Sequence, residues 1–327
     1  MKKSLIALAT LGAFASVASA QSSVTMYGRV DLSVGKNAGS SAKVMQNGSG
    51  SRLGMRGTED LGGGMSAFFN IEHRFDADTG AQSAGPIAAS ATTNAAPLSR
   101  FWTGRSLVGL QGGFGKISLG REYTTAFLGS QLINDPWGWD TVAASTGTAG
   151  ITALGIGTVR NDSSLTYNFS AGGFSLGAQI AEATDTITRV QKKPVNMSLG
   201  YAAGPVALNF GYEKTGAVAA TSAKLWTLGG AFNLGAVKLG ASYGKGETAA
   251  NVERKGYMLT AVAPMGQGEF RAAYGKRKSG ATTDISLIAL GYHYALSKRT
   301  TLYADFARNS ELATSNSAYD FGIKHNF

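Results

Sequence analysis

The chain has 327 residues, of which 45 are glycine, 6 are proline and none is cysteine. The lack of cysteine excludes disulfide scaffolds, cysteine nucleophiles and thiolate metal sites. Abundant glycine with scarce proline indicates many strands joined by tight turns, and excludes a collagenous or disordered chain. The formal net charge is +10, and the basic residues are spread along the chain. This spread along the chain favours a cavity lined with basic residues. The sequence contains no recognised nucleic-acid-binding module, so we expect no nucleic-acid partner.

The beginning of the chain has the composition of an export signal. Two lysines near the start precede an apolar stretch from Leu5 to Val17, and Ala18-Ser19-Ala20 matches a small-x-small cleavage site. The stretch is too short to span a bilayer as a helix, so we expect residues 1–20 to be a cleaved signal peptide. Residues 21–327 would then form one exported domain, in which any membrane residence depends on strands.

Apolar and polar residues alternate in many segments of this domain. In residues 24–34 and 65–75, the apolar side chains fall on one face of a period-two strand and the polar ones on the other. Residues 318–327 alternate in the same way and are rich in aromatic side chains. Such strands suit a barrel wall between lipid and water. A β-sandwich is the soluble alternative, but a sandwich of this length would need several domains and a linker, which the sequence does not contain.

Counting these segments predicts sixteen strands joined alternately by seven short turns and eight longer connections. The longer connections are residues 37–50, 76–100, 124–159, 183–193, 214–223, 247–253, 278–283 and 309–317. An even antiparallel meander with one short-turn end and one long-loop end is typical of outer-membrane barrels. We therefore predict an all-β fold, a 16-stranded antiparallel transmembrane β-barrel that is wide enough for an aqueous channel.

Six segments of the chain stand out by their order and spacing: Tyr27 to Asp31, Ser51 to Gly62, Ser106 to Leu110, Phe114 to Arg121, Arg160 to Tyr167 and Gly322 to Phe327. Together they resemble the trimeric general porins of Gram-negative outer membranes. The resemblance covers residues 21–327. It implies a homotrimer in the outer membrane, in contact with lipid and lipopolysaccharide, that passes small hydrophilic solutes and ions through a water-filled pore. It implies no cofactor and no metal.

In porins of this kind, the third long connection folds back into the barrel and narrows the pore. The corresponding residues 124–159 form a connection far longer than an ordinary loop. The resemblance implies that this loop folds inward, with Trp137 and Trp139 packed against the wall. Asp135 and Asp140 would supply its acidic charge, and the loop would limit the size of the solutes that pass.

A ladder of basic residues on the wall opposite this loop is the second feature that the resemblance implies. Its positions are Arg52, Arg121 and Arg160, with Arg29 lower on the first strand and Glu72 as the acidic partner of the stack. Alternation places Arg29 and Arg52 toward the lumen, whereas Arg121 needs a bulge near Gly120 to turn inward.

Alternation places three more basic side chains in the lumen, those of Arg74, Arg105 and Lys116. The acidic residues expected on the loop, Asp135 and Asp140, are few by comparison. The charges that line the narrowest point of a pore decide which ions pass. A basic ladder opposite a weakly acidic loop therefore predicts a preference for anions.

Three functions other than general diffusion are an enzyme, a solute-specific channel and an adhesin. The chain has no Gly-x-Ser-x-Gly, His-Glu-x-x-His or phosphate-loop motif, so we expect no enzymatic activity. A solute-specific channel, with a saturable site in the lumen, stays open as an alternative. An adhesin or binding barrel that uses its outer loops is the third possibility, although residues 81–96 and 141–150 lack the aromatic patches that favour binding.

Overall fold

The computed structural model describes residues 23–83, 100–182, 193–216 and 221–327. The expected signal peptide, residues 1–20, lies outside the described residues. The strands are β1 (Ser23–Lys36), β2 (Lys43–Gln46), β3 (Ser51–Gly62), β4 (Met65–Phe75), β5 (Ser106–Gly112), β6 (Gly115–Tyr123), β7 (Arg160–Ala171), β8 (Phe174–Ala181), β9 (Val195–Ala203), β10 (Val206–Lys214), β11 (Lys224–Asn233), β12 (Lys238–Glu247), β13 (Glu253–Met265), β14 (Gly268–Ser279), β15 (Thr282–Ala295), β16 (Thr300–Asn309) and β17 (Ser317–Asn326). The helical segments are η1 (Phe127–Gln131), α2 (Thr141–Thr146) and α3 (Thr148–Thr152). None of these described helices is long and apolar enough to cross a membrane.

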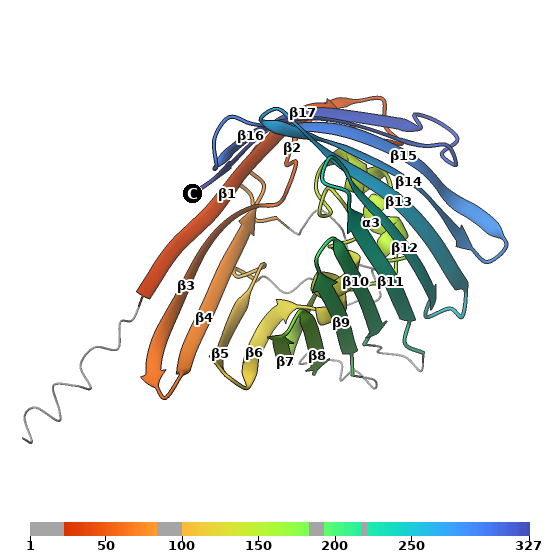
Figure 1. The fold of residues 1–327 in the computed structure, drawn as a ribbon. Helices are drawn as coiled ribbons and strands as arrows, with labels where there is room; N and C mark the ends of the chain where they lie inside the picture. The colour runs from red at the N-terminus through yellow and green to blue at the C-terminus, as the bar shows by residue number, and fades with distance from the viewer. Residues whose placement is uncertain (1–22, 84–99, 183–192, 217–220) are drawn as a thin grey trace, which may run out of the picture.

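All strands except β2 form one closed antiparallel barrel (Figure 1). β1 pairs with β3 on one side and with β17 on the other, so the ring of hydrogen bonds has no open edge. β2 is a four-residue segment that pairs with the last residues of β1. The predicted 16-stranded barrel is therefore confirmed. Closure satisfies the backbone N–H and C=O groups, which would otherwise lack partners in lipid.

Alternation along each strand separates an apolar outer face from a polar inner face. On β1, the side chains of Val24, Met26 and Val34 are exposed, whereas those of Asp31 and Ser33 on the opposite face are buried. Exposed leucine, valine, isoleucine and phenylalanine side chains recur on the other strands. An exposed apolar surface of this extent is stable in contact with lipid rather than water.

The two ends of the barrel differ in the length of their connections. One end has tight turns, such as Gly172-Gly173 between β7 and β8, where φ is 57° and 84° and a side chain would be strained. The other end has the long connections, among them residues 124–159 between β6 and β7. In outer-membrane barrels the short turns are periplasmic and the longer loops are extracellular.

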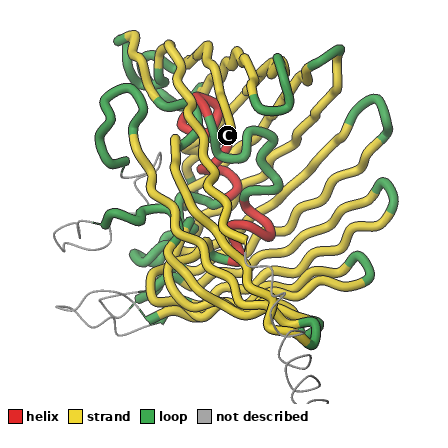
Figure 2. The backbone as a smooth tube through the Cα atoms, turned by 90° about the vertical axis from the view of Figure 1, so that its left-hand side faces the viewer, coloured by secondary structure: helices red, strands yellow, loops and turns green. Residues whose placement is uncertain are grey.

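The helical segments of residues 124–159 lie within the ring of strands (Figure 2). Ile151 of this loop packs with Met258 of β13 and Leu287 of β15 in one buried cluster. Leu154 packs with Leu225 of β11 in another. All five side chains are at most 2% exposed. The apolar core of the described barrel therefore lies between this loop and the inner wall, because most other apolar side chains of the wall point outward.

The assignment of the two faces predicts unequal costs for a new charge. Leu199 lies in the middle of β9 and is 46% exposed on the outer face. We predict that Leu199→Arg lowers the free energy of unfolding in lipid by about 2–4 kcal/mol, because a cation near the bilayer centre loses its hydration. Ser170→Arg on the inner face of β7 is the control and should cost less than about 1 kcal/mol. Urea unfolding in lipid vesicles measures both values, and equal losses would contradict the assignment.

Candidate functional site

The inner face of β1, β3 and β4 carries a row of three arginines. Arg29 lies opposite Arg52 across β1 and β3, and Arg52 lies opposite Arg74 across β3 and β4. Like charges in directly opposite positions of a sheet repel one another and lower its stability. A local arrangement that opposes stability in this way points to a functional role.

Tyr123, the last residue of β6, is the centre on which further guanidinium groups converge. Its hydroxyl oxygen accepts hydrogen bonds from Arg74 Nη2 at 2.5 Å and from Arg160 Nη2 at 2.6 Å. The guanidinium carbons of Arg160 and Arg105 lie 4.2 Å and 4.8 Å from the centroid of its ring. Stacking on the ring and bonding to the phenol oxygen fix the guanidinium groups without removing their charge. We call Arg52, Arg74, Arg105 and Arg160 the arginine cluster.

Two glutamates balance part of the charge of the arginine cluster. Glu72 of β4 accepts a hydrogen bond from Arg74 Nε at 2.7 Å, as expected for the partner of the stack. Glu122 of β6 accepts one from Arg105 Nε at 2.8 Å. Two members of the cluster have no carboxylate within ion-pairing distance among the described residues: Arg52 and Arg160. The cluster therefore keeps an excess of positive charge.

Arg29 connects the wall to the loop. Its Nη1 lies 3.4 Å from Asp140 Oδ2 and donates a hydrogen bond to Ser49 Oγ at 3.0 Å. Its Nε donates to Asn326 Oδ1 at 2.9 Å. The acidic charge of Asp140 is therefore balanced by a wall arginine.

Arg121 differs from the other residues of the expected ladder in its contacts. Its Nη1 lies 2.5 Å from Asp162 Oδ1, and Asp162 also pairs with Arg100 at 2.7 Å. The pairing of β6 with β7 shifts register between Gly120 and Glu122, which lie opposite Ser164 and Asn161, so the extra residue lies in β7 and not in β6. Beyond this shift, Glu122 is the β6 residue that binds the arginine cluster through a side-chain carboxylate. Strict alternation places Glu122 on the inner face of β6 with Ser118. Sequence reasoning missed Glu122 because it assumed a bulge in β6 that would turn Arg121 inward instead.

The loop presents little free acidic charge. Asp135 is buried, with Oδ2 accepting a hydrogen bond from Thr148 Oγ1 at 2.6 Å and Oδ1 accepting one from the Trp137 N–H at 2.9 Å. Burial raises the pKa of Asp135 to about 6, although both hydrogen bonds oppose the rise. Burial also raises the pKa of Asp140, against the opposing effect of Arg29.

Acidic residues of the wall bind the loop, and sequence reasoning missed them. Asp305 of β16 accepts a hydrogen bond from Trp137 Nε1 at 2.7 Å. Asp320 of β17 accepts one from the Val142 N–H of α2 at 3.4 Å. Glu213 of β10 accepts one from the Thr158 N–H at 2.7 Å. Alternation places each of these three carboxylates on the inner face of its strand. It does not predict which atom of the loop each carboxylate binds.

The two tryptophans of the loop differ in their surroundings. Trp137 reaches the wall through its bond to Asp305. Trp139 packs within the loop, with its ring edge-on to that of Phe127 at a centroid distance of 4.8 Å. Trp137 is therefore the one that links the loop directly to a strand by a hydrogen bond.

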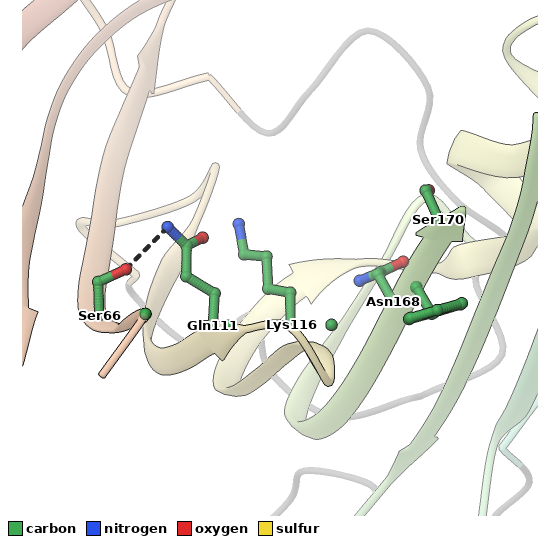
Figure 3. A pocket seen from close by; sticks show the side chains of 9 residues that line it. Ser66, Gln111, Lys116, Asn168 and Ser170 are labelled. Carbon is green, nitrogen blue, oxygen red and sulfur yellow. Dashed lines mark hydrogen bonds between the residues drawn. The ribbon is translucent and has the colours of Figure 1, made fainter. Parts of the chain in front are cut away.

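Lys116 lies at the short-turn end, apart from the arginine cluster. A depression of about 470 Å³ opens there, and its polar side chains are shown in Figure 3: Ser66, Gln111, Lys116, Asn168 and Ser170. Lys116 Nζ lies 4.1 Å from the centroid of the Phe68 ring, and Gln111 donates a hydrogen bond to Ser66 at 3.1 Å. Lys116 makes no ion pair within the part of the chain that the structure describes, so the depression keeps a positive charge.

Comparison with known proteins identifies the family. A sequence profile described as Gram-negative porin matches residues 5–314. The chain belongs to the Gram-negative porin family. An outer membrane porin of Bordetella pertussis is 32% identical in an alignment 252 positions long, which covers 66% of this porin and 60% of that relative. Outer membrane porin protein 32 of Delftia acidovorans is 44% identical in an alignment 128 positions long. This alignment covers 37% of this chain and 32% of the Delftia protein. The matches thus cover less than two thirds of either relative.

Solved structures agree with this assignment. An anion-selective porin from Comamonas acidovorans superposes with a TM-score of 0.75 at 27% identity, over 94% of this porin and 100% of that chain. OmpT of Vibrio cholerae in a trimer form gives a TM-score of 0.67 at 13% identity, which shows the shared barrel fold alone. Family and fold together place this porin in the outer membrane as a β-barrel.

The buried carboxyl of Asp135 predicts that loop packing depends on pH. Burial raises its pKa to about 6 from the ordinary value of 3.8, so the cost of burying the ionised form is present above pH 6. That cost disappears as the pH falls from 6 toward 3.8, and the loop becomes more stable. Asp135→Asn, which is neutral throughout, should reduce the difference, whereas Asp78→Asn in an exposed turn should leave it unchanged.

Hydrogen exchange of the loop amides at pH 5 and pH 8, corrected for intrinsic rates, measures this effect. The parent protein should show greater protection at pH 5. Equal protection of the parent at both pH values would refute the role of Asp135.

Proposed function

We propose that this porin is a general diffusion channel of the outer membrane that passes small hydrophilic solutes and ions and prefers anions. The observation that carries the proposal is the arginine cluster around Tyr123, where Arg52 and Arg160 have no carboxylate partner among the described residues. Fixed charges at the narrow point of a pore set its ion preference. Membership of the porin family makes the chain a channel rather than an enzyme.

Each side of the proposed constriction has its own role. Arg29 and the arginine cluster form the basic side, with Glu72 holding the stack. Residues 124–159 form the opposite side, where Trp137 fixes the loop to the wall. Arg121 contributes less to ion preference, because Asp162 neutralises it. Lys116 extends the basic path toward the short-turn end.

The named relatives support this proposal. The Comamonas structure is described as anion-selective, and its identity of 27% over 94% of this chain makes it a relevant comparison. The trimer form of the Vibrio structure supports a homotrimer for this porin. Within the proposal, residues 1–20 are a cleaved signal peptide, residues 21–327 form the channel, and the outer wall contacts lipid and lipopolysaccharide.

Ion preference should depend on the arginines that lack a carboxylate partner. We expect the double variant Arg52→Gln with Arg160→Gln to bring the ratio of chloride to potassium permeability close to one, because most of the unbalanced charge is removed. Arg121→Gln is the matched control and should change the ratio little, since its charge is paired with Asp162. Reversal potentials in planar bilayers under a salt gradient measure the ratio. A shift for Arg121→Gln as large as that of the double variant would contradict the assignment of these arginines.

The size limit should depend on the loop. Replacing residues 141–152, which hold α2 and α3, by a short glycine-serine linker should raise single-channel conductance and admit larger neutral sugars. The thermal unfolding temperature should fall, because Met258 and Leu287 lose their apolar cover. Shortening residues 248–252 between β12 and β13 is the control and should alter neither property of the pore. Unchanged conductance and sugar permeation in the first variant would exclude the loop as the size limit.

A further inference from the structure

The first long connection ends in a segment that lies inside the barrel, at residues 48–50 between β2 and β3. We call Gly48, Ser49 and Gly50 the inner segment. All three residues are buried, whereas the preceding residues 43–45 of β2 are exposed. The carbonyl oxygen of Gly48 accepts a hydrogen bond from the Thr141 N–H at 2.6 Å, so the inner segment contacts the loop of residues 124–159. Its other two residues contact the basic wall.

Every arginine of the row on β1, β3 and β4 donates a hydrogen bond to the inner segment. The carbonyl oxygen of Gly50 accepts one from Arg52 Nε at 3.0 Å and one from Arg74 Nη1 at 3.3 Å. Ser49 Oγ accepts one from Arg29 Nη1 at 3.0 Å. These acceptors are neutral, so they orient the guanidinium groups without cancelling their charge. One oxygen atom of Gly50 therefore holds two cations of the row beside each other, against their mutual repulsion.

The inner segment is itself fixed by buried hydrogen bonds to neighbouring strands. Ser49 Oγ donates to Asp31 Oδ2 at 2.5 Å, and the Tyr303 hydroxyl of β16 donates to Asp31 Oδ1 at 2.6 Å. The backbone N–H of Asp31 donates at 3.1 Å to Oγ of Ser51, the residue that follows the segment. These four residues are at most 4% exposed. A hydrogen-bonded network buried in this way is rigid, so the inner segment supports the arginines in fixed positions.

The approach of Arg74 requires that residue 50 has no side chain. A Cβ built at Gly50 would lie 2.7 Å from Arg74 Nη1, which is closer than two such atoms approach without bonding. The φ angle of Gly50 is not positive, so the glycine serves this contact and not the course of the backbone. The atom that the Cβ would meet is the end of a flexible side chain. An alanine at position 50 therefore displaces the guanidinium group and leaves the strands in place.

We propose that Gly50 is a specificity-determining residue of the pore, which acts by holding Arg52 and Arg74 together. Two positive charges side by side produce a higher local potential than the same charges apart. When Arg74 is displaced from Gly50, repulsion by Arg52 moves it away. It stays paired with Glu72, and the positive potential at the proposed constriction falls. This inference deepens the proposed function and rests on it, since it concerns the position of the charges that set the ion preference.

The experiment compares two glycine-to-alanine variants of the inner face. Gly50→Ala displaces a guanidinium group, whereas Gly200→Ala on β9 displaces the hydroxyl of Ser175, which is neutral. Reversal potentials in planar bilayers under a salt gradient should show that the ratio of chloride to potassium permeability falls about twofold in Gly50→Ala. The ratio should keep the parent value in Gly200→Ala. The thermal unfolding temperature of Gly50→Ala should stay close to that of the parent, because a purely structural glycine would lower it.

A double-mutant cycle tests whether Gly50 acts through Arg74. In an Arg74→Gln background, Gly50→Ala should cause no further change in the permeability ratio, because the side chain that it displaces is absent. Arg74→Lys keeps the charge but lacks the planar fork that bonds to several partners at once, so it should lower the ratio as Gly50→Ala does. This variant tests the positioning of the charge without any change at Gly50.

The outcomes separate this inference from the proposed function. A parent protein without any ion preference would overturn both. A parent that prefers anions, with the same ratio in Gly50→Ala as in Gly200→Ala, would overturn the inference alone. A further fall in the ratio when Gly50→Ala is added to Arg74→Gln would also overturn it. If Gly50→Ala does not fold, Arg74→Lys decides, and a parent-like ratio in that variant would exclude a role for the position of the charge.

Discussion

A closed ring of this many strands is too wide for its own side chains to fill, and this constraint governs the rest of the structure. Residues 124–159 fill one side of the lumen. They pack on the inner faces of strands from β9 to β17 through apolar contacts such as Ile151 with Met258, and through hydrogen bonds such as Trp137 with Asp305. β3, β4 and β7 present arginines on the opposite side, and Arg29 of β1 lies at the edge of the loop, where it meets Asp140.

Filling one side of the lumen also sorts its charges. Asp305, Asp320 and Glu213 are buried where they accept hydrogen bonds from the loop, and Asp135 is enclosed within the loop itself. These carboxylates are used in holding the loop in place. The arginines opposite have only Glu72 and Glu122 as direct carboxylate partners in the cluster. The electrostatic asymmetry therefore follows from packing, and the net charge of +10 alone does not determine it.

Local patterns explain how much could be predicted from the sequence. Alternation and turn residues predicted the strands and their number, because each depends on neighbours along the chain. The pair of Glu72 with Arg74 was also within reach, since residues two apart share a face of one strand. The bond from Trp137 to Asp305 joins residues 168 positions apart, and no local pattern specifies such a partner. The role of Tyr123 was missed for the same reason, because its arginines come from three other parts of the chain.

Side-chain chemistry explains why arginine and not lysine forms the inner cluster. A planar guanidinium can stack on the ring of Tyr123 and bond to Glu72 or Glu122 from a fixed position. A lysine ammonium on its flexible stem would move among several positions. Fixed charges keep the same field at the surface past which mobile anions diffuse, so the ion preference of the pore does not depend on side-chain motion.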